Sequence, residues 1–147
     1  MVIVMEYVSL IALVLSVISL TWQVFTWSRA GARLTVAYGW SYPVGWREPV
    51  AHRSIIVTNR GRASTMVSSV TSVLPDKHHL PLIADAFERY ELPYELRPGE
   101  SITLHYPPKA IEQALVSQGI PLTTKIRPMA SSGHGDVTGK WLPVNQD

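Results

Sequence analysis

The sequence predicts a mainly β protein that begins with a hydrophobic α-helix. The 22 residues from Tyr7 to Ser28 contain no charged side chain. Several short segments after them alternate apolar and polar residues, as half-buried strands do. Eleven prolines and nine glycines supply turns between short elements. The second part of the chain is therefore expected to form a β-sandwich.

The hydrophobic segment is long enough to cross a bilayer. At about 1.5 Å per residue its helix spans roughly 33 Å, against a hydrocarbon core of about 30 Å. Trp22 and Trp27 stand near its carboxyl end, where aromatic rings favour the membrane interface. A cleaved signal peptide is the alternative, since Ala30-Gly31-Ala32 resembles a cleavage site. The segment's length and the absence of Lys or Arg before it favour a retained membrane helix.

The flanking charges predict an orientation. Arg29 and Arg33 follow the helix, whereas Glu6 and the terminal amine precede it. The positive-inside tendency then places the carboxyl-terminal domain in the cytoplasm, as in a single-pass protein of the cell membrane. We expect the helix at 1–28, a juxtamembrane link at 29–33 and the sandwich at 34–147.

Small and polar residues recur on one face of the predicted helix. From Val8 to Leu20, every position off this stripe is Val, Leu or Ile. The stripe consists of Ser9, Ala12, Ser16, Ser19, Gln23 and Thr26. Spacings of three and four residues suit a helix–helix contact in lipid, either in a homo-oligomer or with another membrane protein. The alternative is that each hydroxyl bonds to a carbonyl of its own helix.

The remaining elements follow from alternation and turn signals. Strands are expected at 34–40, 53–58, 65–74 and 102–106, with weaker candidates at 123–127 and 137–142 around a mobile loop at 131–135. In the third strand, Met66, Val70 and Leu74 are expected to share one side. Helices are expected at 83–90 and, as a short insertion in the sandwich, at 108–118.

Two motifs resemble those of bacterial immunoglobulin-like sandwich domains. IIVTNRGRAS contains Val57, Asn59 and Gly61 at the end of a strand, and LRPGESITLHY contains the Leu96 to Ser101 turn before another. The whole layout is similar to that of actinobacterial and actinophage single-span membrane proteins of unknown function. This resemblance implies an immunoglobulin-like β-sandwich with an interaction role, and it implies no reaction.

The first two strands also predict a basic surface. If they are antiparallel, the turn containing Arg60 and Arg62 returns toward the membrane, close to Arg29 and Arg33. Four arginines would then face anionic headgroups. The alternative is a solvated turn whose arginines only maintain solubility.

No pattern of residues indicates catalysis. The chain has no cysteine, no HExxH motif and no glycine-rich phosphate loop. His52, His78, His79, His105 and His134 are expected to be solvated, and the neighbours Ser132, His134 and Asp136 to lie in a loop rather than a triad. We therefore expect no enzyme activity, metal, cofactor or small-molecule substrate. The scattered basic residues, at a pI near 9.0, also argue against a nucleic-acid partner.

An aromatic segment follows the first strand. YGWSYPVGW contains Trp40, Tyr42 and Trp46. These rings form either the rim of the core or a binding edge for a partner protein. The expected function is a membrane-anchored, non-catalytic interaction module. The alternative is a structural component of a larger assembly, such as a phage particle or a secretion machine, with the helix packed among protein helices.

Overall fold

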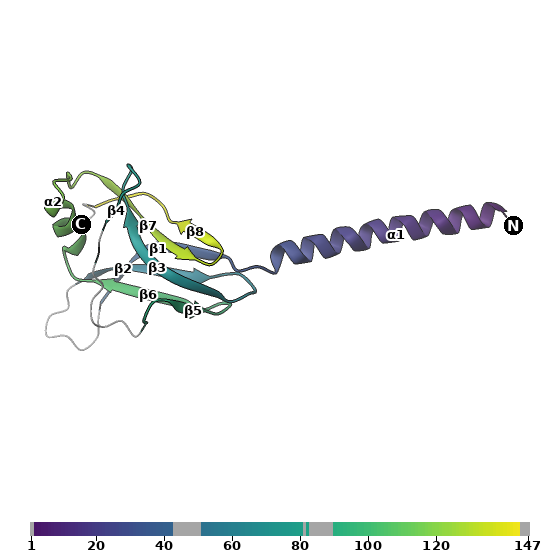
Figure 1. The fold of residues 1–147 in the computed structure, drawn as a ribbon, viewed down its shortest axis with the longest axis horizontal. Helices are drawn as coiled ribbons and strands as arrows, with labels where there is room; N and C mark the ends of the chain where they lie inside the picture. The colour runs from purple at the N-terminus through teal and green to yellow at the C-terminus, as the bar shows by residue number, and fades with distance from the viewer. Residues whose placement is uncertain (1, 43–50, 81, 83–89, 145–147) are drawn as a thin grey trace. The chain divides into compact units, whose positions relative to one another are not determined.

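The computed structural model describes residues 2–42, 51–80, 82 and 90–144, with the side chains of the first helix from Tyr7 onward (Figure 1). The chain divides into two compact units, Met1–Gly31 and Ala32–Asp147. The first contains the helix α1 (Val2–Arg29). The second is an antiparallel β domain with one short helix. The prediction of a mainly β protein with an N-terminal apolar helix is therefore confirmed.

Helix α1 carries the uncharged segment. From Tyr7 to Arg29 it is long and apolar enough to cross a membrane. Its described side chains are all exposed, including the large apolar ones such as Leu13, Val14 and Phe25. A helix satisfies all its backbone hydrogen bonds internally except at its ends, which suits a segment surrounded by lipid.

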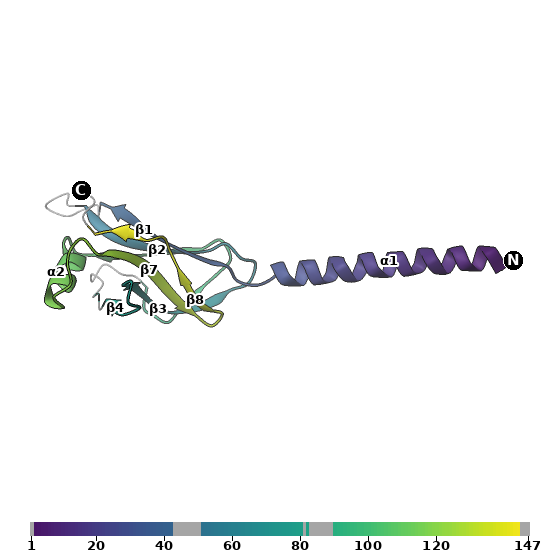
Figure 2. The ribbon, with the colours of Figure 1, turned by 90° about the horizontal axis from the view of Figure 1, so that it is seen from above.

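Three strands form the smaller sheet, in the order β1-β2-β6 (Figure 1), and β1 and β2 lie side by side in Figure 2. They are β1 (Leu34–Ser41), β2 (His52–Asn59) and β6 (Ser101–Tyr106). Leu34 pairs with Asn59, and Thr58 pairs with Ser101, so both pairings are antiparallel. The inner side chains Ile55 and Val57 are fully buried, as their alternation predicts.

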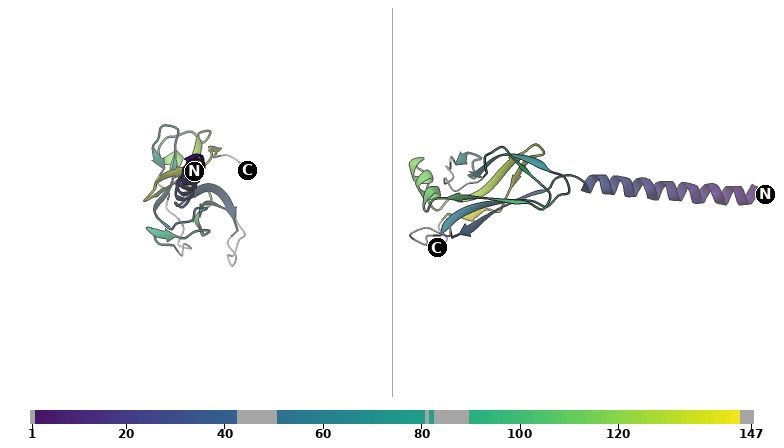
Figure 3. Two further views of the ribbon diagram at one scale, coloured as in Figure 1. Left: turned by 90° about the vertical axis from the view of Figure 1, so that its right-hand side faces the viewer. Right: turned by 90° about the horizontal axis from the view of Figure 1, so that it is seen from below.

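The larger sheet has the order β4-β3-β7-β8, with β5 also paired to β3 and β9 to β7. Figure 3 shows the β domain from two further sides. The strands are β3 (Thr65–Val73), β4 (His79–Leu80), β5 (Tyr94–Leu96), β7 (Lys125–Ser132), β8 (Gly135–Thr138) and β9 (Leu142–Pro143). Gly139 follows β8 beside β1, where an added Cβ would lie 2.5 Å from the Val36 carbonyl oxygen. The two sheets therefore approach each other closely along this side.

Two apolar clusters form the core. In the first, Val36 and Ile102 of the smaller sheet join Val67 and Ala130 of the larger one. In the second, α2 (Ala110–Ser117) covers one end of the strands, where Leu115 packs with Leu74 and Ile126, among others (Figure 1). The described residues of both clusters all follow the link, so this unit contains its own core.

The helix expected at 108–118 is confirmed, with shifted ends. Pro108 precedes α2, and the N-cap Lys109 has a φ of 64°. Gly119 closes the helix with a φ of 69°, donating its N–H to the Val116 carbonyl. Of the helix expected at 83–90, residues 83–89 lie outside the described residues, while Tyr90 packs against the first cluster.

Two expectations about the larger sheet are wrong. A β-bulge between Val67 and Ser69 changes the side to which later residues of β3 point, so Met66 is exposed whereas Val70 packs against the core. Residues 131–135, expected to be a mobile loop, instead contain the end of β7, a tight turn and the start of β8. Ser132 pairs with Gly135 across this hairpin.

The strands give the β domain two ends, called here the link end and the far end. The link end carries the start of β1 at Leu34, the end of β2 at Asn59 and the end of β5 at Leu96. The far end carries the end of β1 at Ser41, the start of β2 and helix α2. The candidate sites on this unit lie at these two ends.

Candidate functional site

The stripe residues lie along the exposed surface of α1. The hydroxyl of Ser16 donates to the Ala12 carbonyl at 2.8 Å, and the hydroxyl of Thr26 donates to the Trp22 carbonyl. This is the back-bonding that the sequence left open as the alternative. It satisfies the hydroxyl proton, and the oxygen keeps capacity to accept a bond from a neighbouring helix.

Aromatic and basic residues gather in the last turns of α1. The Arg29 guanidinium carbon lies 4.1 Å from the centre of the Phe25 ring, and the Trp22 ring lies 6.0 Å from that same ring. Trp27 is 81% exposed. Amphipathic rings beside a cation suit the boundary between lipid tails and headgroups.

Asn59 organises the link end. Its side-chain oxygen accepts bonds from the backbone N–H groups of Arg33 (3.3 Å) and Gly61 (2.9 Å). Its amide nitrogen donates to the carbonyls of Ala63 (2.8 Å) and Leu96 (3.0 Å). One buried side chain thus holds together the start of β1, the turn after β2 and the end of β5.

This network brings the predicted basic residues of the β domain together. The N–H of Arg60 donates to the Arg33 carbonyl at 2.7 Å, and Arg33, Arg60 and Arg62 are all exposed. The N–H of Gly99 donates to the Asn59 carbonyl at 2.8 Å, which adds the turn containing exposed Arg97. Sequence reasoning missed Arg97 because its turn is far from the others along the chain.

The Glu100 side chain stabilises the turn that contains Arg97. The Glu100 carboxylate accepts the backbone N–H of Arg97 (2.9 Å) and the hydroxyl of Tyr94 (2.7 Å). These two hydrogen bonds, with the Arg97 backbone first, hold the pKa of Glu100 below its usual range. The carboxylate therefore stays ionised, and it offsets part of the positive charge at the link end.

At the far end, two of the predicted aromatic residues are exposed. Trp40 is 56% and Tyr42 is 66% exposed, while Trp46 lies outside the described residues. Trp40 pairs across the sheet with Arg53 of β2. The Arg53 guanidinium carbon lies 5.0 Å from the Trp40 ring centre and 5.5 Å from that of Tyr38. Both contacts lie within cation–π range.

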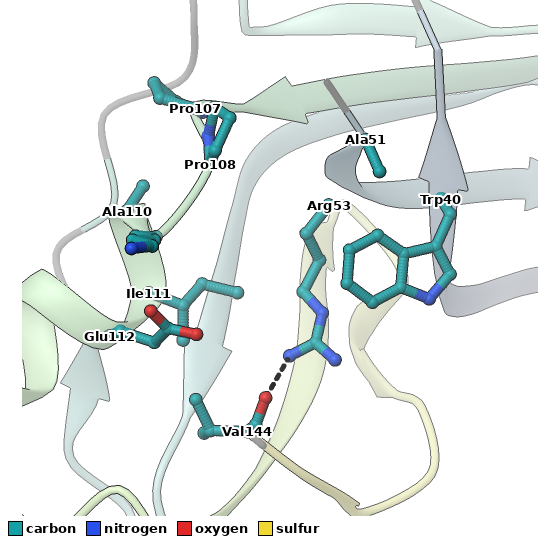
Figure 4. Close-up of a pocket in the computed structure, with 10 residues that line it drawn as sticks. Trp40, Ala51, Arg53, Pro107, Pro108, Ala110, Ile111, Glu112 and Val144 are labelled. Carbon is teal, nitrogen blue, oxygen red and sulfur yellow. Dashed lines mark hydrogen bonds between the residues drawn. The ribbon is translucent and has the colours of Figure 1, made fainter. Parts of the chain in front are cut away.

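A pocket of about 210 Å³ opens beside this arginine (Figure 4). Its walls include Trp40, Pro107, Pro108, Ile111 and Glu112, contributed by β1, the segment after β6 and α2. One guanidinium nitrogen of Arg53 donates to the Val144 carbonyl at 3.4 Å. Burial of the half-buried side chain lowers the pKa of Arg53 from its usual value.

No protein-family model and no curated protein sequence matches this chain.

The expectation that the histidines are all solvated is wrong for His52, which is buried at the far end of β2. His105 is half-buried, and its Nδ1 lies 2.6 Å from the Ser41 hydroxyl, which links β6 to β1 across β2. His134 contacts the Thr65 hydroxyl at 2.9 Å rather than assembling with Ser132 and an acid. Strand pairing brought these residues together, and sequence spacing gives no signal for it.

The His78 imidazole forms an ion pair with a carboxylate. Its Nδ1 lies 2.7 Å from Asp76 Oδ2, and both side chains are exposed. The hydrogen bond raises the pKa of His78 and lowers that of Asp76. Within the described residues, no group of three or more His, Asp or Glu side chains could hold a metal ion.

Proposed function

We propose that this protein is a membrane-anchored, non-catalytic interaction module. The supporting observation is the contrast between its two units. Helix α1 exposes its large apolar side chains along the whole described segment, whereas the β domain buries its own two clusters. An isolated apolar helix gains a favourable environment only in lipid or against other apolar helices.

In this proposal the helix both inserts and associates. Ser9, Ala12, Ser16, Ser19, Gln23 and Thr26 form the contact with a second copy or with another membrane protein. Trp22 and Trp27 lie at the membrane surface with Arg29. The far end of the β domain, with Trp40 and Tyr42, is the surface offered to a partner.

In this proposal the arginines at the link end also lie at the membrane surface. Only residues 30–33 connect α1 to β1, and five residue steps span at most about 17 Å when fully extended. An inserted helix therefore keeps Arg33, Arg60, Arg62 and Arg97 close to the headgroups. These arginines favour an anionic leaflet, consistent with the positive-inside orientation and a cytoplasmic β domain.

The two turns that carry the resemblance also support an immunoglobulin-like arrangement. The turn after Asn59 and the turn before β6 are adjacent, joined by the hydrogen bond from the Gly99 N–H to the Asn59 carbonyl. Residues of both antiparallel sheets pack together in the first apolar cluster.

Extraction of membranes at alkaline pH tests the anchor. A protein that spans the bilayer stays in the membrane pellet after carbonate washing. Release into the supernatant contradicts the proposal. If the released protein then sediments with a large particle without detergent, the alternative role in a phage particle or secretion machine is favoured.

Thiol labelling tests the orientation. The chain has no cysteine, so one cysteine introduced at exposed Lys140 is the only reactive thiol. In intact cells a cytoplasmic domain resists an impermeant reagent and reacts after lysis. Labelling before lysis would place the β domain on the opposite side.

A further inference from the structure

The pocket at the far end is lined by both charged and apolar side chains. The Arg53 guanidinium lies on one side, and the apolar lining residues include Trp40, Pro107, Pro108 and Ile111 (Figure 4). The lining segments come from β1, β2, α2 and the residue Val144 after β9. The pocket is therefore built by the tertiary fold rather than by one loop.

Arg53 has unused capacity to bind an anion. A guanidinium has five N–H donors, and the long bond to the Val144 carbonyl uses one of them. Among the described residues no carboxylate forms an ion pair with Arg53, although the Glu112 carboxylate acts on its charge at longer range. The guanidinium carbon lies 5.0 Å from the ring centre of Trp40 and 5.5 Å from that of Tyr38, and the planar guanidinium fork suits two-point binding of a carboxylate.

The size and charge of the pocket limit the ligand. At about 210 Å³ it is smaller than the roughly 300–1,000 Å³ of typical small-molecule pockets, so it suits one residue-sized group. Glu112 stands on the wall opposite Arg53 and disfavours a doubly charged anion such as phosphate. An Asp or Glu side chain would bring only one or two methylene groups to the apolar walls.

We propose that this pocket, the Arg53 pocket, binds the carboxyl terminus of a partner polypeptide whose last residue is apolar. The terminal carboxylate pairs with the Arg53 guanidinium, and the last side chain packs against Trp40 and Ile111. This inference rests on the proposed role as an interaction module, and it names the feature of the partner that the module recognises.

The test uses the full-length protein in detergent micelles and N-acetyl-L-leucine as the probe, which carries a free carboxylate and one apolar side chain. Titration is followed by NMR through the Arg53 Nε–H and Trp40 indole N–H signals, identified by their loss in Arg53→Met and Trp40→Phe. We expect saturable shifts of both signals. N-acetyl-L-leucinamide, which lacks the carboxylate, should bind at least tenfold more weakly. Inorganic phosphate should not compete at equal concentration.

Variants distinguish binding in the Arg53 pocket from non-specific attraction of the probe to basic side chains. Arg53→Met should weaken binding at least tenfold, read from the Trp40 signal, and Arg53→Lys should weaken it by a smaller factor because the charge remains and the fork is lost. Arg127→Met is the matched control, since Arg127 also stacks on a tryptophan, 4.6 Å from the ring centre of Trp141, outside the pocket. It should leave binding unchanged.

The proposed binding in the Arg53 pocket and the proposed membrane anchor can be contradicted independently of each other. Absence of saturable shifts in the wild-type protein, equal binding of the amide, or equal loss in Arg127→Met would each overturn the Arg53 pocket. None of these outcomes alters the retention of the protein in carbonate-washed membranes. Release from membranes with intact probe binding would overturn the anchor and leave the pocket in place.

Discussion

Asn59 accepts a hydrogen bond from the backbone N–H of Arg33 with its side-chain oxygen, at 3.3 Å. The same oxygen accepts the Gly61 N–H, and the amide nitrogen donates to two carbonyls. This oxygen and nitrogen assignment is the one that satisfies all four groups. The Asn-x-Gly sequence thus closes the turn after β2 and attaches the start of β1 to it.

Replacing Asn59 by Ala should destabilise the β domain by about 2–4 kcal/mol, because buried polar groups at the link end lose their partners. Urea unfolding of the fragment 29–147 measures the change in the free energy of unfolding. Thr58→Ala is the control, since the Thr58 hydroxyl bonds to Ser101 in a solvent-exposed contact. It should cost less than about 1 kcal/mol. Equal losses for the two variants would contradict the role of Asn59.

Tyr38→Phe should lower stability by about 1–2 kcal/mol at neutral pH, since the Tyr38 hydroxyl lies 2.6 Å from the buried Ser72 hydroxyl. Burial raises the pKa of Tyr38 from 10.0 to about 12. Because the folded pKa is the higher one, the protonated phenol contributes its stability below pH 10.0 and loses it as pH rises toward 12.

The alkaline loss of stability should therefore be shallower in Tyr38→Phe than in the wild-type fragment. Urea midpoints measured from neutral pH to above pH 10.0 provide the comparison. Parallel pH profiles for the two proteins would show that Tyr38 titrates in the folded state as it does in the unfolded chain.

Gly139→Ala should destabilise the domain by about 1–3 kcal/mol. Its added Cβ would lie 2.5 Å from the Val36 carbonyl oxygen and 2.6 Å from the Pro128 ring, so backbone must move. At Gly133 an added Cβ meets nothing within 4 Å, which makes Gly133→Ala the matched control. Thermal unfolding of both variants should show a clear loss only for Gly139→Ala.

Arg60→Glu combined with Arg62→Glu should weaken binding of the fragment 29–147 to vesicles containing anionic lipid. Each arginine near an anionic surface contributes about 1 kcal/mol, and salt screens the effect. Lys77→Glu with Lys125→Glu changes the net charge equally, at the far end of the larger sheet. Co-sedimentation at low salt should show a much smaller effect for this control pair. If the wild-type fragment does not bind such vesicles, the proposed lipid-binding site is contradicted.

Ser16→Leu combined with Ser19→Leu should weaken association of the full-length protein in detergent, because bulkier side chains keep helices apart. Insertion should persist, since leucine is strongly apolar. Val14→Leu with Val17→Leu has the same spacing off the stripe and should leave association unchanged. Chemical crosslinking measures both. Equal crosslinking of all forms would assign the stripe hydroxyls to bonding within their own helix alone.

Secondary structure was predicted most accurately from the sequence where neighbouring residues follow one clear pattern of burial. The uncharged run before Arg29 predicts an apolar helix of membrane-spanning length, and the alternation in β1, β2 and β6 indicates one buried face. The extent of β7 was missed because Pro128 interrupts its alternation and prolines usually indicate the edge or end of a strand. The bulge in β3 was missed because one unpaired residue leaves no mark in the sequence.

The sequence by itself determined the apolar helix, the short link, the individual strands of the smaller sheet and the residue types available for binding, since each depends on neighbouring residues. Only the tertiary structure decided that Arg53 stacks beside Trp40 and that Arg97 joins Arg60 around Asn59. These partners are far apart along the chain and meet through strand register and turn packing. Register depends on the burial of a whole face at once, so it is a property of the assembled sheets rather than of any one segment.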